Sequence, residues 1–572
     1  MGSSLLQKGW CVSVCVLCFS LTSGVHADKT VDGTVFVDGK RPIAWTDENF
    51  ICATLDWWPP EKCDYGNCSW GHASLLNLAC VSFMHFLLLD LLMFAFSPLK
   101  IRLGGTLQDK VIYQTEDSRG PCKPFAESPS ELFGYTDACL PLARWDELNS
   151  FFKEAEAVII FGLNALHGKS IHPNYTATGP WNPSNAASFI HYTAKKGYQI
   201  YGWELGQSLD FGHISCSCQG NELCGKGIGV GVAADTYASD TIVLYNLIRD
   251  IYKGDNAKPQ IIGPGGFFDS GWFEQYIAKT AGSLDAVTHH IYNLGSGRNE
   301  HLIYRILNPS VLDGGADVFK ALEGILRSSG TSAAAWVGES GGAYNSGRNR
   351  VTNAFVFSFW YLDQLGLAST YNTKTYCRQS LIGGNYGLLN TTTFVPNPDY
   401  YRLKENEFLL ALSLLPGLSL AANYSICSFW HKLMGRSVLL TNFTGTKRVR
   451  AYSHCAKQSK GVVLLLINLD GSTAVQAKIE AKGRLMNLHK NRHYLHNSKV
   501  SGLTREEYHL TPKDGNIQSQ TVLLNGKALT VGSSGAIPAL DPVTISLSKP
   551  ITVAPFSIVF VHFPDVAMPA CR

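Results

Sequence analysis

The chain has 572 residues, of which 45% are hydrophobic and 16% are charged, a composition typical of a folded globular protein. Its formal net charge of +3 is too small to favour nucleic acid or another polyanion as the main partner. Because the chain is longer than a single compact core usually is, we expect two domains.

Residues 1–27 have the pattern of a secretory signal peptide. Lys8 precedes an apolar stretch, and small residues near Ala27 mark the expected cleavage site. An N-terminal membrane anchor is the alternative. We therefore expect a secreted protein, located outside the cell or in the cell wall, with the lysosome or vacuole as the alternative compartment.

Cysteines and glycosylation motifs are consistent with export. Three of the 16 cysteines lie within residues 1–27, so 16 − 3 = 13, an odd number, remain for an oxidising compartment. Their pairing cannot be deduced from the sequence. Asn-X-Ser/Thr triplets predict N-glycosylation at Asn67, Asn174, Asn390, Asn423 and Asn442.

Residues 28–46 contain "KTVDGTVFVDGKRPIA", a pattern that predicts short strands. We expect them to join a β-sheet formed by the C-terminal part of the chain, because β-sandwiches recruit strands that are distant in sequence.

From residue 47 to about residue 415, short apolar runs alternate with segments of helical periodicity. Residues 233–253, for example, carry apolar side chains at three- and four-residue spacing. Alternating strands and helices imply parallel pairing, so we predict an α/β fold with a closed (β/α)8 TIM barrel. Buried strands are predicted at residues 99–105, 157–165, 199–206, 259–266, 285–292 and 333–340.

Two segments interrupt this alternation. Residues 75–99 are apolar for about the length of a bilayer span, but His85 and Asp90 fall within them and they continue directly into a predicted strand. We therefore expect no integral membrane span; a transmembrane helix is the alternative, and peripheral membrane association stays open. The second interrupting segment covers residues 402–428.

Residues 416–572 form the second predicted domain. Short runs such as "GVVLLLINL" and "SIVFVHFP" are separated by Gly, Pro, Asn and Asp, which is typical of antiparallel strands. We predict a C-terminal antiparallel β-sandwich.

Glutamates follow two of the predicted barrel strands. Glu339 ends "AAWVGE", and the stretch "YGWELGQSLDFGHISCSCQGNELCGKG" offers both Glu204 and Glu222. The active groups of (β/α)8 enzymes lie at the C-terminal ends of the strands, and a pair of carboxylates there can hydrolyse a glycosidic bond. A salt bridge or a loop cap is the alternative role for each glutamate.

Several longer motifs resemble one enzyme family. "VTHHIYNLG", "AAWVGESGGAYNSG", "IGGNYGLLN" and "FSPLKIRLGGTLQDK" are similar to motifs of the plant heparanase-like β-glucuronidases of glycoside hydrolase family 79. The resemblance extends from about Lys29 to the C-terminus. It implies a (β/α)8 barrel with a β-sandwich, a retaining mechanism with two glutamates, and an acid/base glutamate preceded by asparagine.

In that family the phrase Trp-Glu-Leu-Gly-Asn-Glu-Leu is continuous, whereas residues 207–220 interrupt it here. The resemblance therefore implies that Glu222, which follows Asn221, is the general acid/base and that Glu339 is the nucleophile. Glu204 is then the upstream strand glutamate. The segments at about residues 79–94, 207–220 and 402–428 are either genuine protein or errors in gene prediction.

The resemblance also implies a set of substrate contacts. Asn221 is expected to bond a sugar hydroxyl, and His290 and Tyr292 to stand beside the nucleophile, although a satisfied buried pair is the alternative for these two. The loop of Gly384, Asn385 and Tyr386 is expected to receive the uronic carboxylate. Further sugar contacts, with plain loop structure as the alternative, are expected at Thr106, Asp109, Asp56 and Tyr344.

We expect a carbohydrate partner, either a β-glucuronide or a polysaccharide that contains glucuronic acid, and neither a cofactor, a metal nor a nucleic acid. The sequence shows no basic cluster suited to sulfated chains, which favours plant arabinogalactan or small-molecule glucuronides.

Two other readings of the interrupted stretch exist. One is a zinc site formed by His213, Cys216, Cys218 and Cys224, which the Cys-X-Cys spacing disfavours. The other is a non-catalytic carbohydrate-binding or non-functional isoform in which the insertion displaces Glu222.

Overall fold

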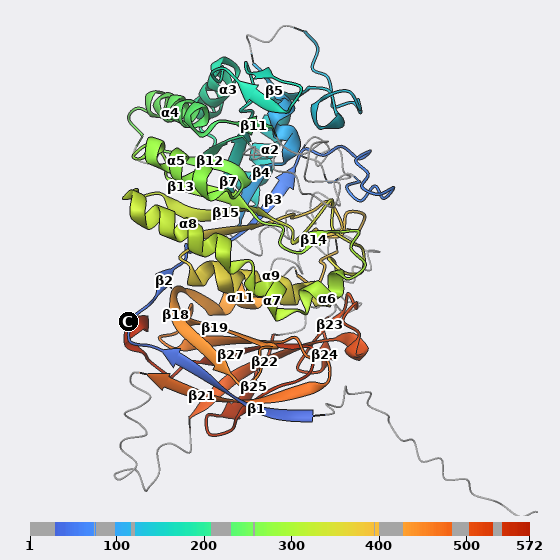
Figure 1. Ribbon diagram of the computed structural model, residues 1–572, viewed down its shortest axis with the longest axis vertical. Helices are drawn as coiled ribbons and strands as arrows, with labels where there is room; N and C mark the ends of the chain where they lie inside the picture. The colour runs from blue at the N-terminus through green and yellow to red at the C-terminus, as the bar shows by residue number, and fades with distance from the viewer. Residues whose placement is uncertain are drawn as a thin grey trace, which may run out of the picture.

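A barrel and a β domain are stacked along the long axis of the molecule (Figure 1). The computed structural model describes residues 29–71, 73, 75, 98–115, 120–206, 230–255, 258–393, 395–399, 427–482, 503–529 and 540–572.

Eight parallel strands close the barrel, which confirms the predicted (β/α)8 fold class. Nearly all of their residues are buried, because helices cover the outside and side chains fill the inside. The sequence predicted six of these strands and missed the first and the last. In chain order the strands are β3 (Ile51–Asp56), β4 (Lys100–Gly104), β7 (Val158–Leu163), β10 (Gly202–Leu205), β12 (Gln260–Phe267), β13 (Ala286–His290), β15 (Ala334–Ser340) and β17 (Thr375–Arg378).

Helices follow the strands and turn their apolar stripes towards the barrel (Figure 1). Their ends carry ordinary signals: Asp269 caps α5 by accepting a hydrogen bond from the Trp272 N–H at 2.8 Å. The helices are α2 (Leu142–Glu154), α3 (Ser184–Lys195), α4 (Ala234–Ile251), α5 (Ser270–Thr280), α6 (Leu302–Ile306), α7 (Pro309–Asp313), α8 (Ala316–Ser329) and α9 (Phe355–Thr370).

Helix α9 lies between the barrel and the β domain. Almost all of its residues are buried, as expected for a helix that is covered on every side. Gly366 allows close contact with the β domain, since a Cβ there would lie 2.4 Å from the Tyr452 ring. Asp363 accepts hydrogen bonds of 2.6 Å from Arg450 Nε and from the Tyr452 hydroxyl. One fully buried carboxylate therefore ties the helix to the sheet.

The β domain combines both ends of the chain. Strand β1 (Lys29–Asp38) pairs antiparallel with β18 (Met434–Thr444) and parallel with β21 (Thr473–Lys482). The sheet continues through the remaining strands, among them β19 (Val449–Ala456), β20 (Val462–Asn468), β22 (Thr504–Pro512) and β27 (Ser557–Phe563).

Strand β20 is buried on both faces. Val463, Leu465 and Ile467 belong to the core that continues into the barrel. Leu464 and Leu466 belong to a second core within the β domain, together with Val35 of β1. This double burial accounts for the continuous apolar run "VVLLLI", which lacks the alternation of a half-exposed strand.

Four disulfides join described cysteines: Cys52–Cys377, Cys63–Cys68, Cys122–Cys139 and Cys455–Cys571. The first connects the adjacent barrel strands β3 and β17. No helix within the described part of the chain has the length and apolarity of a membrane span. Residues 76–97, which form most of the apolar stretch noted above, and residues 401–426 lie outside the described residues.

We expect Asp363→Ala to lower the free energy of unfolding by about 3–5 kcal/mol, because it leaves the Arg450 cation without its buried partner. Urea denaturation of the whole protein measures the change. Glu323→Ala is the control, since Glu323 pairs with the exposed Arg327 on the surface of α8, and such pairs contribute less than about 1 kcal/mol. Equal effects of the two substitutions would contradict the role given to Asp363.

Candidate active site

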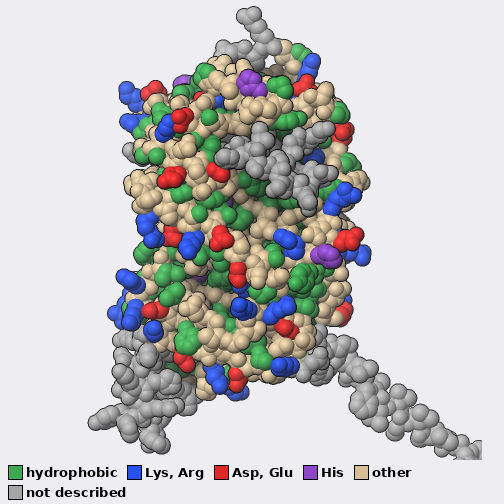
Figure 2. Space-filling view, viewed as in Figure 1, with side chains coloured by type: hydrophobic (Ala, Val, Ile, Leu, Met, Phe, Trp, Pro, Cys, Tyr) green, Lys and Arg blue, Asp and Glu red, His purple; other side chains and the backbone are tan. Residues whose placement is uncertain are grey.

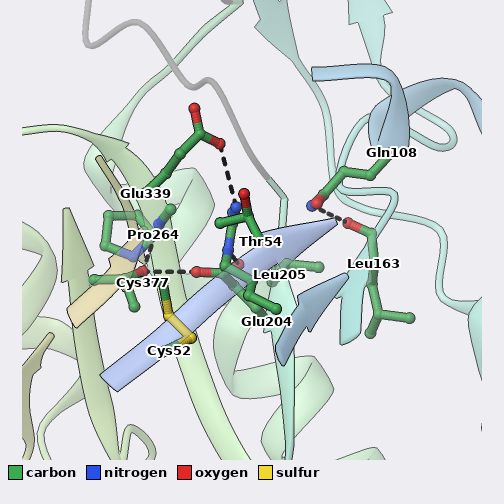
Figure 3. A network of polar contacts seen from close by, with 12 residues as sticks. Cys52, Thr54, Gln108, Leu163, Glu204, Leu205, Pro264, Glu339 and Cys377 are labelled. Atoms are coloured by element: carbon green, nitrogen blue, oxygen red, sulfur yellow. Dashed lines mark hydrogen bonds and ion pairs between the residues drawn. A yellow bond between two sulfur atoms is a disulfide. The ribbon is translucent and has the colours of Figure 1, made fainter. Parts of the chain in front are cut away.

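Glu339 lies near the C-terminal end of β15, on the side of the barrel where enzymes of this fold place their active groups. Among the donors to its carboxylate, the Tyr292 hydroxyl donates to Oε1 at 2.7 Å and Arg102 Nη1 donates to Oε2 at 3.4 Å. In Figure 3 the Glu339 side chain extends away from its strand, with one dashed contact to its carboxylate. The side chain is 9% exposed.

Arg102, on β4, is bonded to a second carboxylate, Glu204 on β10. Arg102 Nε donates to Glu204 Oε2, and the Thr288 hydroxyl donates to Glu204 Oε1 at 2.8 Å. The Gly265 N–H in turn donates to Thr288 at 2.8 Å. Glu204 is completely buried. Both of its oxygens are thus occupied, and its role is to balance and orient Arg102.

Burial raises the pKa of Glu339, and the nearby Glu204 charge adds to this effect. The Arg102 charge and the Tyr292 hydrogen bond act in the opposite direction and favour the ionised form. The carboxylate that these groups hold is therefore fixed in orientation and largely removed from water, which suits a nucleophile.

Asp56, at the end of β3, is the third buried carboxyl group of this cluster. Gln379 Nε2 donates to its Oδ2 at 2.7 Å, and Oδ1 has no hydrogen-bond partner among the described residues. Burial, followed by the charge of Glu339, raises the pKa of Asp56 to about 7. Near neutral pH, Asp56 is therefore partly protonated and able to donate a hydrogen bond.

Two tyrosines pack side by side next to Glu339. A Cβ at Gly341 would lie 2.7 Å from Tyr292 Cε1 and 3.2 Å from Tyr386 Cδ1, so glycine is required at this contact. Gly384 is also close to the Tyr386 ring, at 2.7 Å from a Cβ position, and has a φ of +68° that favours glycine. The "GGNYG" loop therefore meets β15, the strand that carries Glu339.

His290 ends β13 and pairs in register with Glu339 of β15. Burial and the nearby Arg102 charge lower its pKa well below the ordinary value, so the imidazole is neutral. Its Nε2 has no hydrogen-bond partner within the described ranges.

Comparison with known proteins decides the family. The model of the glycosyl hydrolase family 79 N-terminal domain matches residues 32–366. Heparanase-like protein 3 of Arabidopsis thaliana is 53% identical over 570 residues, covering 98% of each chain. The chain belongs to glycoside hydrolase family 79. The baicalin-beta-D-glucuronidase of Scutellaria baicalensis is 41% identical over 585 residues, which cover 99% of this chain and 98% of that enzyme.

Solved structures agree with the fold of this family 79 chain. A 4-O-alpha-L-rhamnosyl-beta-D-glucuronidase from Fusarium oxysporum has a TM-score of 0.54 at 13% identity, covering 92% of this chain and 99% of that one. An alpha-L-arabinofuranosidase from Thermotoga maritima has a TM-score of 0.56 at 13% identity, covering 93% and 99%. At such identities the likeness concerns the fold. Together with the family match and the plant relatives, it identifies the protein as a glycoside hydrolase.

The other predicted sugar contacts of the family 79 enzyme lie around this cluster or serve its loops. Tyr344, in β16 (Ala343–Tyr344), is half-buried beside β14 (Gly295–Ser296). The Asn385 N–H donates to the Ser346 carbonyl at 2.7 Å, which joins the loop after Tyr344 to the "GGNYG" loop.

Thr106 and Asp109 lie in the 3₁₀ helix η1 (Thr106–Lys110) and are buried. Asp109 Oδ1 accepts a hydrogen bond from the Ala165 N–H at 2.7 Å, so this carboxylate anchors the loop that follows β7. A direct sugar contact of Asp109 stays a prediction.

Asn221 and Glu222 lie outside the described residues, and so do the residues of the zinc alternative. Their roles therefore stay predictions. Among the predicted glycosylation sites, Asn67, Asn174 and Asn442 are exposed. Asn390 is half-buried, with Oδ1 accepting from the Thr392 and Thr393 N–H groups at 3.0 Å, and Asn423 lies outside the described part of the chain.

Three residues of the cluster were missed by the sequence analysis: Arg102, Gln379 and Thr288. Arg102 did carry a signal, because a lone arginine within the buried strand "LKIRLGG" requires a buried anion. Gln379 and Thr288 carry no comparable signal, since their partners come from distant strands.

Asp56 makes the stability of the protein depend on pH. Because its pKa is raised in the folded state, its contribution to stability is full below about pH 4 and is lost as the pH rises through about 7. We expect Asp56→Asn to reduce this loss by on the order of 2–4 kcal/mol, measured by urea denaturation from pH 4 to pH 8. The exposed Asp317→Asn serves as control and should follow the parent. If Asp56→Asn also follows it, the buried carboxyl does not titrate in this range.

Proposed function

We propose that this enzyme is a secreted, retaining β-glucuronidase with Glu339 as nucleophile and Glu222 as general acid/base. The observation that supports it best is the Glu339 carboxylate, held by Arg102 and Tyr292 near a barrel strand end. In a retaining mechanism this carboxylate attacks the anomeric carbon, and the leaving oxygen takes its proton from the acid. The same residue, now ionised, acts as a base and activates water, which hydrolyses the glycosyl-enzyme and releases the sugar and the free Glu339 carboxylate.

A uronic sugar suits the polar groups around Glu339. Asp56, with a pKa of about 7, is able to donate to a sugar oxygen instead of repelling a second anion. Gly384 lies buried against the Tyr386 ring, and in this proposal its backbone N–H meets the uronic carboxylate. The relative from Scutellaria baicalensis, which is named as a glucuronidase, supports this choice.

The natural substrate in this proposal is a plant arabinogalactan glucuronide or a small-molecule glucuronide. On the face shown in Figure 2, Lys and Arg side chains alternate with Asp and Glu side chains. Such a mixed surface gives no support to a sulfated polyanion. Secretion is supported by the N-terminal pattern, by the described disulfides and by the exposed sequons at Asn67, Asn174 and Asn442.

The second candidate function is carbohydrate binding without hydrolysis. It is favoured by the fourteen residues at 207–220 that separate Gly206 from Asn221. A displacement of the Glu222 carboxyl group by about 1 Å costs on the order of a hundredfold in rate. A larger displacement would abolish turnover, while the sugar contacts on the other strands persist.

We expect removal of residues 207–220 to raise hydrolysis of an aryl β-glucuronide by at least about a hundredfold, because it restores the path from β10 to the acid/base. Release of the fluorescent aglycone measures the rate. Glu339→Gln in the shortened chain should abolish turnover, whereas Glu323→Gln on the surface of α8 should not change it. Full activity of the Glu339 variant would remove the nucleophile assignment.

The pH dependence of the shortened chain tests the contact between Tyr292 and Glu339. Tyr292→Phe removes a hydrogen bond that lowers the pKa of Glu339, so this pKa rises. Because the nucleophile must be ionised, the acidic limb of kcat/KM moves to higher pH by about one unit.

The matched control for this measurement is Tyr376→Phe. The Tyr376 hydroxyl donates to Ser340 on the same strand as Glu339. Its removal should leave the acidic limb in place. An unchanged limb in Tyr292→Phe would show that Tyr292 does not act on the titrating carboxylate.

A further inference from the structure

One aromatic side chain at the barrel rim faces the same space as the nucleophile. Phe267 is the last residue of β12 and pairs in register with His290 of β13, which pairs with Glu339 of β15. Residues paired in a parallel ladder point to the same face of the sheet. Phe267, His290 and Glu339 therefore form one level across three adjacent strands.

The ring of Phe267 contacts other side chains of the site. Its centroid lies 6.2 Å from that of His290 and 6.1 Å from that of Tyr292, the donor to Glu339. It is half-buried and does not belong to the hydrophobic core. The adjacent Phe268 instead packs on Phe273 of α5, with centroids 4.9 Å apart, and against the core.

The strand order separates a polar arc of the rim from an arc that carries Phe267. Strands β17, β3 and β4 contribute Asp56 and Arg102, with Gln379 directly after β17. The other arc runs from β10 through β12 and β13 to β15. The predicted acid/base follows β10, so Phe267 lies on the strand next to it, where the leaving group of a glycoside departs.

We infer that Phe267 is a platform for the aglycone and that it selects β-glucuronides of flat aromatic aglycones; the inference rests on the proposed β-glucuronidase function. A flat ring stacks on Phe267 in an offset or edge-on arrangement and loses no hydrogen bond. A sugar aglycone can place only the C–H groups of one ring face on Phe267, so it covers less of the aromatic surface than a flat ring does. The polar arc then holds the glucuronic acid.

Binding of non-hydrolysable thioglycosides tests the inference without requiring turnover. The dissociation constants of 4-methylumbelliferyl and methyl thio-β-glucuronide are measured by calorimetry on the full chain. We expect Phe267→Ala to weaken the aryl ligand about tenfold and the methyl ligand less than about twofold. Phe267→Tyr, which keeps the ring, should retain the preference, and Phe268→Leu should change neither constant.

The outcomes separate this inference from the proposed function. If Phe267→Ala weakens the binding of both ligands equally, or of neither, the platform role of Phe267 is overturned. Binding of neither ligand by the parent overturns it as well. If the parent binds both thioglycosides but neither it nor the chain without residues 207–220 hydrolyses the corresponding O-glycosides, the proposed hydrolysis fails, while the comparison at Phe267 still decides the platform.

Discussion

The active site depends on one buried cation, Arg102. It lies between Glu204, which has no exposed surface, and Glu339, and Asp56 adds a third acidic group to the same low-dielectric space. A single buried cation cannot balance three ionised carboxylates. Burial first, and the neighbouring acidic charges in addition, raise the pKa values of Asp56 and Glu339. Removing Arg102 would leave two buried anions without compensation, a cost that few folds tolerate.

Strands β3 and β17, on the arc opposite Phe267, are joined by a disulfide as well as by hydrogen bonds. Cys52 and Cys377 join β3 to β17, and the residues just beyond them on these strands, Asp56 and Gln379, bond to one another. Asp56 and Gln379 are thus fixed on a closed part of the barrel wall. Residues 207–220, which interrupt the phrase expected from the family resemblance, follow β10 in the sequence and lie outside the described residues.

The sequence was informative where local periodicity matched the tertiary role. The alternation of strands and helices predicted the barrel class. Glu339 was predicted as a site residue because it follows a buried apolar run. Strands β3 and β17 escaped because both carry polar residues, such as Thr54 and Arg378, that are buried only once the barrel has formed. Arg102 escaped as well, although the sequence analysis named the acidic residues Glu204, Glu339 and Asp56 one by one. Its partners lie 102 and 237 residues away in sequence, and no local pattern shows which carboxylates a buried arginine will meet.

Strand β1 must wait for its partner strand while the protein is being synthesised. It is translated first, yet its partner in the sheet is β18, and Thr34 and Thr444 are separated by 410 residues. At about 5–20 residues per second, a ribosome needs on the order of 20–80 s to make that partner. Throughout this interval the apolar segment around Val35 and Val37 has no sheet to join. The β domain therefore cannot complete its sheet until most of the chain has left the ribosome.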